Sequence, residues 1–420
     1  MIKKVKLGEV ADLSIGFVGT VTTQYENGGI PFLRTLNVKP YKIIDNDLKR
    51  ITKEFHESQK KSKLMEGDVA MVHTGVPGIC CVIPEEYNNS NCIDMIVIKP
   101  HKDKINAHYL AAYMNTVGYK HIEKQQVGCI QKHFNLKDAE ELEIFLPDIE
   151  TQNKIGEMVN NINNKIENNN AINAELESMA KTIYDYWFLQ FEFPNEDGKP
   201  YKSSGGKMVW NEELKREIPE GWEVGTFGDV ISSLECGDRP SGGAENEGIP
   251  SIGAENIISI GKYDFSSEKY ISDVYFQSMK CGIVKSWDVL IYKDGAGVGQ
   301  VSMFGDGFPY DKCAINSHVF ILRSENNIFQ NYLYLTLTCE HVKKILKTLA
   351  MKAAQPGLNQ PAVKSIPLVV PPQNVLKKFN IQCDSFFHKI FNCANENKEL
   401  ASLRDFLLPM LMNGQVGFKD

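Results

Sequence analysis

Two long stretches of the chain share one repeating pattern of apolar positions. In the first stretch, intervals of four and three residues alternate, which is a heptad seam: Ile155, Val159, Ile162, Ile166, Asn169, Asn173 and Leu176. A shift of 224 residues gives the same seam again: Phe379, Cys383, Phe386, Ile390, Cys393, Asn397 and Leu400. A helix with a single apolar stripe needs a partner. We therefore expect the two helices to pack on each other as an intramolecular antiparallel coiled coil.

Two asparagines, Asn173 and Asn397, fall at equivalent positions of this seam. A polar residue at a seam position often sets the register of a coiled coil at some cost in stability. Alternatively, both amides face solvent where the seam frays. The sequence leaves both interpretations open.

Short apolar or alternating runs, separated by Gly and Pro, precede each helix. They include residues 68–73 (DVAMVH), 95–99 (MIVIK), 289–293 (VLIYK) and 318–323 (HVFILR). Such runs predict strands, and helical patterns at 108–115 and 331–338 lie between them. The predicted fold class is α+β, with two globular domains joined by the two long helices.

The two globular segments repeat each other in sequence. Residues 4–10 (KVKLGEV) and 27–38 (NGGIPFLRTLNV) match residues 222–230 (WEVGTFGDV) and 246–257 (NEGIPSIGAENI). A repeat of nearly domain size indicates a duplicated module, for which we expect a pseudo-twofold arrangement. The predicted boundaries are 1–146 for the first globular domain, 147–190 for the central helix, 191–220 for a linker, 221–370 for the second globular domain and 371–420 for the distal helix.

Composition and charge narrow the class of protein. The 420 residues are too many for one ordinary core, and no run of eighteen apolar residues predicts a membrane span. Ten cysteines occur without a C-x-x-C pair and the first residues lack a signal-peptide pattern, so we expect reduced thiols in a cytoplasmic protein. The net charge of -7 counts against a free-standing nucleic-acid binder but does not exclude a local basic groove.

Sequence motifs for catalysis are missing. The Pro-Pro pair at 371–372 lacks the Asn or Asp before it and the aromatic residue after it that an adenine methyltransferase uses. Residues 295–299 (GAGVG) precede a predicted strand rather than the helix of a dinucleotide-binding loop. We therefore expect a binding protein with no catalytic residues, cofactor or metal of its own.

In their order, these features resemble the specificity subunit of type I restriction–modification systems, over essentially the whole chain. The resemblance rests on the LGEV start at 7–10, the paired GIP segments, the Leu-Pro and Val-Pro junctions before the helices, residues 355–359 (QPGLN) and the linker at 193–210. Each motif is weak singly, but the order, occurring twice, is specific. One departure is that residues 131–135 read QKHFN where the second module reads QPGLN.

This resemblance implies a function and a set of partners. It implies two target-recognition domains that read an asymmetric bipartite target in double-stranded DNA with a non-specific spacer. It also implies two modification subunits, which bind S-adenosylmethionine and methylate adenine, and restriction subunits, which use ATP and Mg to translocate and cut. The setting would be bacterial or archaeal phage defence.

Polar residues on predicted loops and strand ends are candidates for DNA contact, because base edges and phosphates take such side chains. They are Arg34, Thr35, Asn37, Lys39, Thr74, Gln131, Lys132 and His133 in the first module, and Arg239, Ser241, Asn256, Lys293, Lys352, Gln355 and Asn359 in the second. For each, the alternative is an ordinary solvated surface position. Asp68 and Asp288 recur at equivalent strand starts, where we expect a structural role in a turn.

Apolar residues beyond the seam are candidates for docking of a modification subunit. They are Tyr184, Tyr186, Trp187 and Phe188 after the first helix and Leu408, Met410 and Leu411 in the second. Packing under the second module explains the aromatic set equally well. At the level of the whole chain, the alternatives to a specificity subunit are a stand-alone restriction or methylation enzyme and a coiled-coil scaffold that binds proteins alone.

Overall fold

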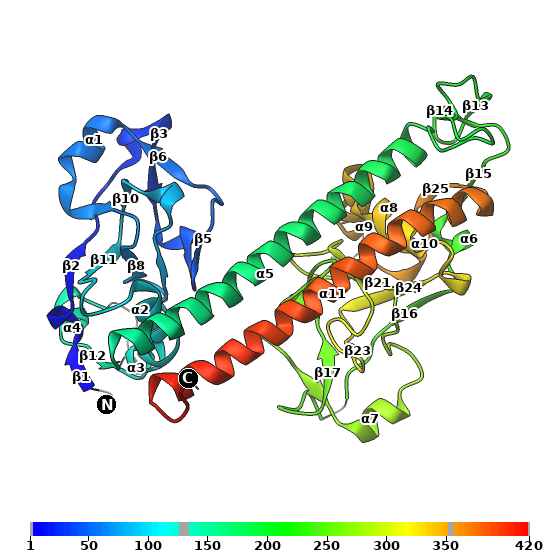
Figure 1. Cartoon of the computed structure of the whole chain (residues 1–420). Coiled ribbons are helices and arrows are strands. Elements are labelled where there is room, and N and C mark those ends of the chain that lie inside the picture. The colour runs from blue at the N-terminus through cyan, green and yellow to red at the C-terminus, as the bar shows by residue number, and fades with distance from the viewer. Residues whose placement is uncertain (1–2, 126–133, 241, 352–356, 419–420) are drawn as a thin grey trace. The chain divides into compact units, whose positions relative to one another are not determined.

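The computed structural model describes residues 3–125, 134–240, 242–351 and 357–418. The chain divides into two compact units, Met1–Ile166 with Glu399–Asp420 and Glu167–Lys398, and the division passes through both long helices. We call the globular part of the first unit head one (residues 3–146) and that of the second unit head two (residues 223–370). Figure 1 shows sheets and short helices in each head.

Head one contains two four-stranded sheets. The first is antiparallel, in the order β2 (Ala11–Ile15), β11 (Met95–Pro100), β8 (Val69–Val72), β9 (Cys80–Val82). The second runs β6 (Lys49–Ile51), β3 (Tyr25–Leu33), β10 (Ser90–Cys92), β7 (Lys63–Leu64), with β3 parallel to β10. Two small pairs join β1 (Lys3–Lys6) to β12 (Glu143–Leu146) and β4 (Val38–Lys39) to β5 (Lys42–Ile43). The helices are α1 (Lys53–Ser58), α2 (Ala107–Tyr113), α3 (Tyr119–Gln125) and α4 (Leu136–Glu140).

Head two repeats this plan. Its main sheet runs β16 (Ser233–Cys236), β24 (Val319–Arg323), β21 (Asp288–Tyr292), β22 (Val301–Phe304), and its second runs β20 (Tyr270–Ile271), β17 (Ile249–Ile252), β23 (Ala314–Ile315). The small pairs are β15 (Glu223–Thr226) with β25 (Pro367–Val370) and β18 (Ile257–Ser259) with β19 (Lys262–Tyr263). The helices are α6 (Phe227–Val230), α7 (Asp273–Ser278), α8 (Gln330–Thr338), α9 (Glu340–Met351) and α10 (Gln360–Lys364). The predicted α+β fold and the duplication are confirmed.

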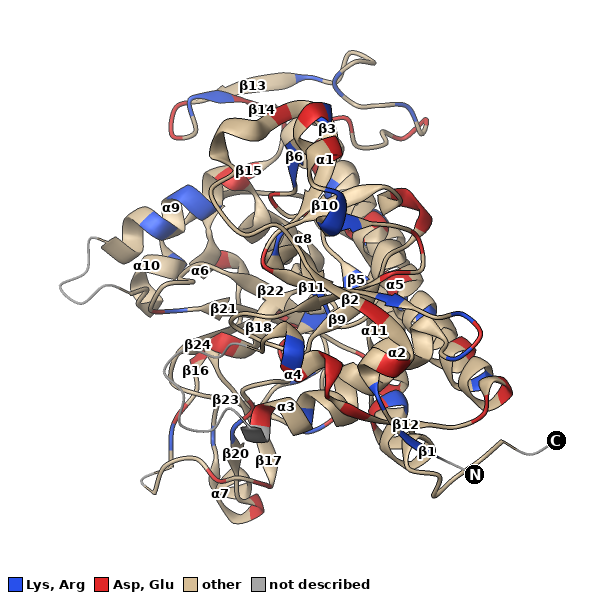
Figure 2. Ribbon diagram, turned by 90° about the vertical axis from the view of Figure 1, so that its left-hand side faces the viewer, with Lys and Arg blue, Asp and Glu red and all other residues tan. Residues whose placement is uncertain are grey.

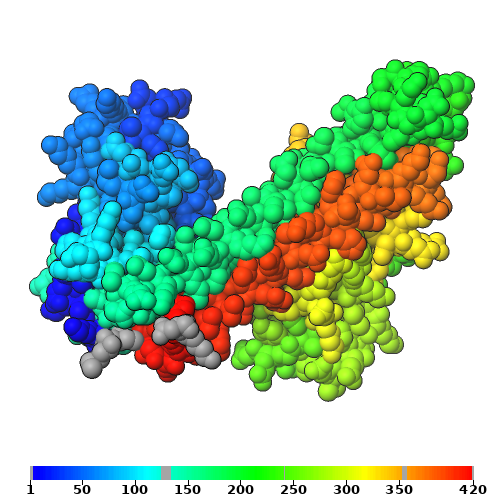
Figure 3. Space-filling view, in the orientation of Figure 1, coloured from blue at the N-terminus to red at the C-terminus, as the bar shows by residue number. Residues whose placement is uncertain are grey.

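The two long helices are α5 (Ile149–Tyr184) and α11 (Gln373–Met412). Within the second unit, the amide of Asn169 donates to Asn397 Oδ1 at 2.9 Å, and that of Asn173 donates to the carbonyl of Ile390 at 3.3 Å. Residue numbers rise along one helix as they fall along the other, so the helices run antiparallel. Figure 3 shows the two in side-by-side contact, α5 in green and α11 in orange. In the first unit, Arg404 donates to Asn163 Oδ1 at 2.7 Å.

Burial varies along the seam. Ile155 and Val159 belong to the core of the first unit together with Leu408, Leu411 and Met412 of α11. Asn169 and Asn173 are buried, and Ile162, Ile166 and Leu176 are half-buried. In α11 the buried set is wider than a heptad stripe, because Phe387, Phe391 and Ala394 are buried beside Phe379, Cys383, Ile390 and Cys393, whereas Phe386, Asn397 and Leu400 are half-buried. Head two covers this broader face, since its core cluster includes all three of the added residues.

The segment expected to be a linker is an ordered part of the second unit. It contains the hairpin of β13 (Met208–Asn211) and β14 (Arg216–Pro219). Phe193 stacks between Tyr201 and Trp222, with ring centroids 4.6 and 4.9 Å apart. The Gly/Ser-rich composition of residues 203–206 therefore forms turns beside an aromatic cluster rather than a flexible tether. Among the helices of the described ranges, none has the length and apolar character needed to cross a membrane.

Candidate nucleic-acid interface

Several loops of head two leave the main sheet at the same end. Cys236, the last residue of β16, pairs with Phe320 near the start of β24, and Tyr292, the last residue of β21, pairs with Val319. Because neighbouring strands are antiparallel, the loop after Cys236, the loop after Tyr292 and the loop before Val319 all emerge there. We call this edge the sheet end of head two.

Hydrogen bonds hold these loops against one another. The Lys293 ammonium donates to the carbonyl of Ser317 at 2.8 Å, and the backbone N–H of Lys293 donates to that of His318 at 2.9 Å. Gly237 approaches so closely that an added Cβ would lie 2.0 Å from the carbonyl oxygen of Ile315, so only glycine fits. The N–H of Leu358 donates to the carbonyl of Lys293 at 2.7 Å, which anchors residues 357–359 at the same place.

Head one has the same sheet end. Ile15 of β2 pairs with Ile96, and Val72 of β8 pairs with Met95 at the start of β11. The N–H of Phe134 donates to the carbonyl of His73 at 3.0 Å. This hydrogen bond is equivalent to the one from the N–H of Leu358 to the carbonyl of Lys293 in head two. In head one, Thr74 Oγ1 lies 2.6 Å from His73 Nδ1.

The predicted DNA contacts divide into three groups on the structure. Thr74, Arg239, Lys293 and Asn359 lie on the loops that meet at the two sheet ends, and Arg239 and Asn359 are exposed there. The side chain of Asn359 also caps α10 by accepting from the N–H of Ala362 at 2.8 Å. Gln131, Lys132, His133, Ser241, Lys352 and Gln355 lie outside the described residues.

The third group follows β3 and β17, where two of the predictions need correction. Asn37 and Asn256 are buried rather than exposed, and each side chain is fully used by the backbone. Asn37 Oδ1 accepts from the N–H of Arg34 at 3.0 Å and Asn256 Oδ1 from that of Gly253 at 2.9 Å. The amide of Asn256 donates to the carbonyl of Asp264 at 2.8 Å, and that of Asn37 to two carbonyls across its own hairpin. Both asparagines therefore hold a turn and cannot read a base.

The neighbours of Asn37 are more accessible. Lys39 is exposed, and Thr35 is half-buried at the surface of the turn. The guanidinium of Arg34 pairs with the carboxylate of Asp47 at 2.7 Å. A contact between Arg34 and DNA would therefore have to compete with this ion pair.

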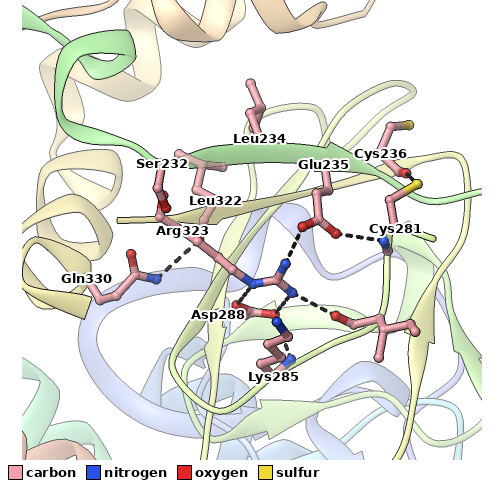
Figure 4. A network of polar contacts seen from close by, with 12 residues as sticks. Ser232, Leu234, Glu235, Cys236, Cys281, Lys285, Asp288, Leu322, Arg323 and Gln330 are labelled. Atoms are coloured by element: carbon pink, nitrogen blue, oxygen red, sulfur yellow. Dashed lines mark hydrogen bonds and ion pairs between the residues drawn. The ribbon is translucent and has the colours of Figure 1, made fainter. Parts of the chain in front are cut away.

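The two aspartates at equivalent strand starts hold turns, as expected. Asp68 accepts from the N–H of Met65 at 2.9 Å and Asp288 from that of Lys285 at 2.7 Å. Asp288 also receives two hydrogen bonds of 2.6 Å from Arg323, whose guanidinium reaches Glu235 as well (Figure 4). Burial raises the pKa of the Asp288 carboxyl, and Arg323 opposes that rise by favouring the charged form.

Helix α9 adds basic side chains that sequence analysis missed. Lys344 and Lys347 are exposed and Lys343 is half-buried on one helix, which Figure 2 shows as blue segments. Val342, Leu346 and Ala350 form its buried face. The helix ends at Met351, a few residues before Leu358 reaches the sheet end. The amphipathic pattern of residues 340–351 in the sequence could have predicted this helix and its exposed lysines.

Comparison with known protein families assigns the same family model to two segments of the chain, one around each head. The model for the type I restriction modification DNA specificity domain matches residues 2–178 and again residues 219–400. The chain belongs to this family. The two matched segments coincide with the duplication that the sheets show, so each head with its following helix is one copy of the specificity domain.

Named relatives of this specificity-domain protein come from archaea and bacteria. The MjaIX type I restriction enzyme specificity subunit of Methanocaldococcus jannaschii is 24% identical, covering 100% of this chain and 94% of the relative. The HindI specificity subunit of Haemophilus influenzae is 24% identical, covering 76% and 80%. The crystal structure of a type I restriction–modification S subunit from M. genitalium has a TM-score of 0.59 at 14% identity, covering 98% of this chain and 96% of that one. The last similarity shows a shared fold.

The predicted docking set also needs correction in this specificity-domain protein. Tyr184, Trp187 and Phe188 are buried in the core of the second unit, where Phe188 packs 4.8 Å from both Tyr332 and Phe379. The hydroxyl of Tyr184 lies 3.0 Å from that of Thr336. These three side chains therefore pack in the core of the second unit, which was the alternative to docking of a modification subunit. Tyr186 remains exposed. In α11, Leu408 and Leu411 are likewise buried and Met410 is half-buried.

Proposed function

We propose that this chain is the sequence-specific DNA-recognition subunit of a type I restriction–modification complex and has no catalytic activity of its own. The observation that carries the proposal is the duplicated sheet end, on which the same strands present loops with different side chains in the two heads. Head one has His73 and Thr74 at the positions of Lys293 and Asp294 in head two. Two heads with unlike loops suit two unlike half-sites.

Contacts with DNA divide by chemistry. Base edges are read at the sheet ends, where Thr74 and Arg239 stand on accessible loops. Phosphates take the lysines of α9, since ammonium groups bind phosphate without reading sequence. Because the whole chain carries a net charge of -7, the isolated chain binds DNA weakly, and tight binding requires the modification subunits.

Two equivalent exposed apolar patches suit two modification subunits. Met179 and Tyr186 are 42% and 40% exposed in the second unit. The corresponding positions, 224 residues later, are Leu403, which is 49% exposed, and Met410, and Phe406 beside them is 66% exposed. These patches replace the buried aromatic set as the docking surface. Bound there, modification subunits would supply S-adenosylmethionine and adenine methylation, restriction subunits would supply ATP- and Mg-dependent cleavage, and α5 with α11 would set the spacer.

Sequencing of adenine methylation tests the proposal. The chain is expressed in cells with its modification subunit, and the expected result is one new bipartite methylated motif with unlike halves. Exchange of residues 1–146 for another head is expected to change one half alone. An active methyltransferase without any new motif would contradict the specificity role.

A docking test uses matched variants. Met179→Glu and Leu403→Glu each place a charge in one patch, and each is expected to remove one modification subunit, so that mass measurement of the complex finds one in place of two. The matched control is Ile381→Glu, because Ile381 is 75% exposed on α11 outside both patches. If Ile381→Glu weakens assembly as much as the other two, the patches are not the docking surface.

A coiled-coil scaffold remains the second candidate, because α5 and α11 are the longest elements of the structure. The two candidates differ in their response to salt. DNA binding weakens steeply as salt rises, since cations are released from the phosphates. Scaffold contacts through apolar stripes change little.

A further inference from the structure

One pair of side chains at the sheet end of head two was absent from the predicted contacts. His318 immediately precedes β24, and its Nδ1 lies 2.5 Å from Oδ1 of Asp294, which follows β21. The side chains of His318 and Asp294 are 37% and 30% exposed, so solvent reaches both. The pair therefore bridges two adjacent strands on the surface where the loops meet.

The surrounding loops are built around this pair. Lys293 binds the carbonyl of His318 through its backbone N–H, and Gly357 packs against Asp294 so closely that an added Cβ would lie 3.1 Å from the Asp294 Cβ. The N–H of Asn316 donates to the carbonyl of Ile252 at 2.9 Å, which ties the end of β17 to the same place. Loops from four parts of head two thus frame one histidine.

The charges around His318 distinguish between two kinds of DNA contact. Asp294 is its direct partner, and the nearby Lys293 ammonium is engaged by the carbonyl of Ser317. A phosphate would meet the Asp294 carboxylate here, which disfavours binding. A base edge is uncharged, and carboxylates and histidine can both hydrogen-bond to it. The position therefore suits base reading rather than phosphate binding.

We propose that His318 is a specificity-determining residue that reads a base edge in the half-site of head two, and that Asp294 is its positioning residue. The proposal rests on the proposed function and deepens it. By accepting from Nδ1–H, Asp294 fixes the ring orientation and leaves Nε2 as an acceptor directed away from the pair. Adenine N6 and cytosine N4 carry the amino groups that donate to such an acceptor in the major groove.

Head one cannot make this contact. The strand register places Asp94 at the position of His318 and Thr74 at the position of Asp294. An aspartate and a threonine present different acceptors and donors, so the base chosen by head one differs. The His318–Asp294 pair therefore contributes to the asymmetry of the target.

The test compares the methylated motif of the wild-type chain with those of His318→Ala and Asp294→Asn, each expressed with the modification subunit. His318→Ala is expected to relax one base pair in one half of the motif, with discrimination there falling roughly 5- to 140-fold, the range for one good base contact. Asp294→Asn is expected to relax the same base pair to a smaller extent. The other half stays unchanged.

A second His–Asp pair with the same Nδ1–oxygen distance provides the control. His388 Nδ1 lies 2.5 Å from Asp306 in the same unit, but His388 is on α11. His388→Ala is expected to leave the motif intact. An unchanged motif for His318→Ala, or a uniform loss of methylation at all sites, would overturn the assignment of His318. A wild-type chain that yields no motif would instead contradict the proposed function itself.

Discussion

Head one and head two share a four-stranded main sheet of the same order but differ in polar chemistry at one buried site of that sheet. In head two, Arg323 joins Asp288 and Glu235 across β24, β21 and β16. In head one, the strand register puts Lys99, Asp68 and Ser14 at these positions. Ser14 donates its hydroxyl to the carbonyl of Lys61 at 2.8 Å, where Glu235 instead accepts from the N–H of Gly282 at 2.8 Å. The turn roles of the two aspartates are kept, and the charged network belongs to one head alone.

This difference shows which features of the duplicated module are interchangeable. Asn37 and Asn256, and likewise Asn135 and Asn359, perform identical backbone tasks in the two heads. Such side chains satisfy N–H and C=O groups that the fold itself creates, so they recur. The residues that follow β8 and β21 at the sheet ends do differ, because head one has His73 and Thr74 where head two has Lys293 and Asp294.

The largest expected effect is a loss of stability in head two when the ion pair of its buried Asp288 is broken. Arg323→Met leaves Asp288, which is 2% exposed, without its partner and is expected to lower the free energy of unfolding by about 3–5 kcal/mol. Lys99→Met in head one is expected to cost less than about 1 kcal/mol, because Lys99 forms no ion pair among the described residues. All four tryptophans, Trp187, Trp210, Trp222 and Trp287, lie in the second unit, so their fluorescence in urea measures the loss in Arg323→Met. Far-UV circular dichroism reports both units and measures the loss in Lys99→Met. Equal losses of unfolding free energy in both variants would contradict the view that the charged network belongs to head two alone.

The buried asparagines are expected to behave alike in both heads. Asn256→Ala leaves the N–H of Gly253 and the carbonyl of Asp264 unpaired and is expected to cost about 2–4 kcal/mol. Asn37→Ala is expected to cost as much. Chemical denaturation measures both, and methylation sequencing is expected to find the DNA motif unaltered. A motif that changed in a folded variant would restore these residues to the recognition surface.

The next prediction compares the turn of each head that contacts the long helix α11. Tyr41 and Gly261 occupy equivalent turns with φ of 68° and 66°, and each meets α11, Tyr41 beneath Arg404 and Gly261 against Ile390. Gly261→Ala is expected to cost about 1–3 kcal/mol through strain at positive φ, besides a Cβ placed 2.5 Å from Ile390. Tyr41→Gly relieves strain but loses the contact with Arg404 and the packing of the Tyr41 ring against the core of the first unit, so it is expected to lower thermal stability by about 1–2 kcal/mol. A gain in stability for Tyr41→Gly would show that relief of strain dominates.

The smallest effect concerns the polar seam of the second unit. Asn173 Oδ1 is buried and has no hydrogen-bond partner among the described residues. Asn173→Leu removes this unpaired acceptor but also the 3.3 Å hydrogen bond from the Asn173 amide to the carbonyl of Ile390, so the expected gain in stability in urea denaturation is less than about 1 kcal/mol. Asn169→Leu, its matched control, loses hydrogen bonds to Glu396 and Asn397 and is expected to be destabilising. A loss of stability in Asn173→Leu would favour a register role for Asn173.

Local periodicity and repetition were sufficient to predict much of the architecture. A heptad spacing identifies a helix face whatever surrounds it, and the 224-residue shift revealed the second helix and the duplicated module. Strands such as β8, β11, β21 and β24 followed from short apolar runs. Asp68 and Asp288 were assigned to turns because equal positions in a repeat indicate equal backbone tasks.

Burial and the meeting of distant loops were decided by the tertiary structure. Nothing local distinguishes Asn37, which binds its own hairpin, from Arg34 or Lys39 nearby, because its partners are backbone groups brought into place by folding. For Trp187 and Phe188 the sequence left docking and internal packing equally open, and the structure buries both in the core of the second unit. His318 and Asp294 lie 24 residues apart in the chain and meet because the register of β21 and β24 aligns their ends. Periodicity is a property of the chain, whereas a site requires contacts between segments that only the packed sheet brings together.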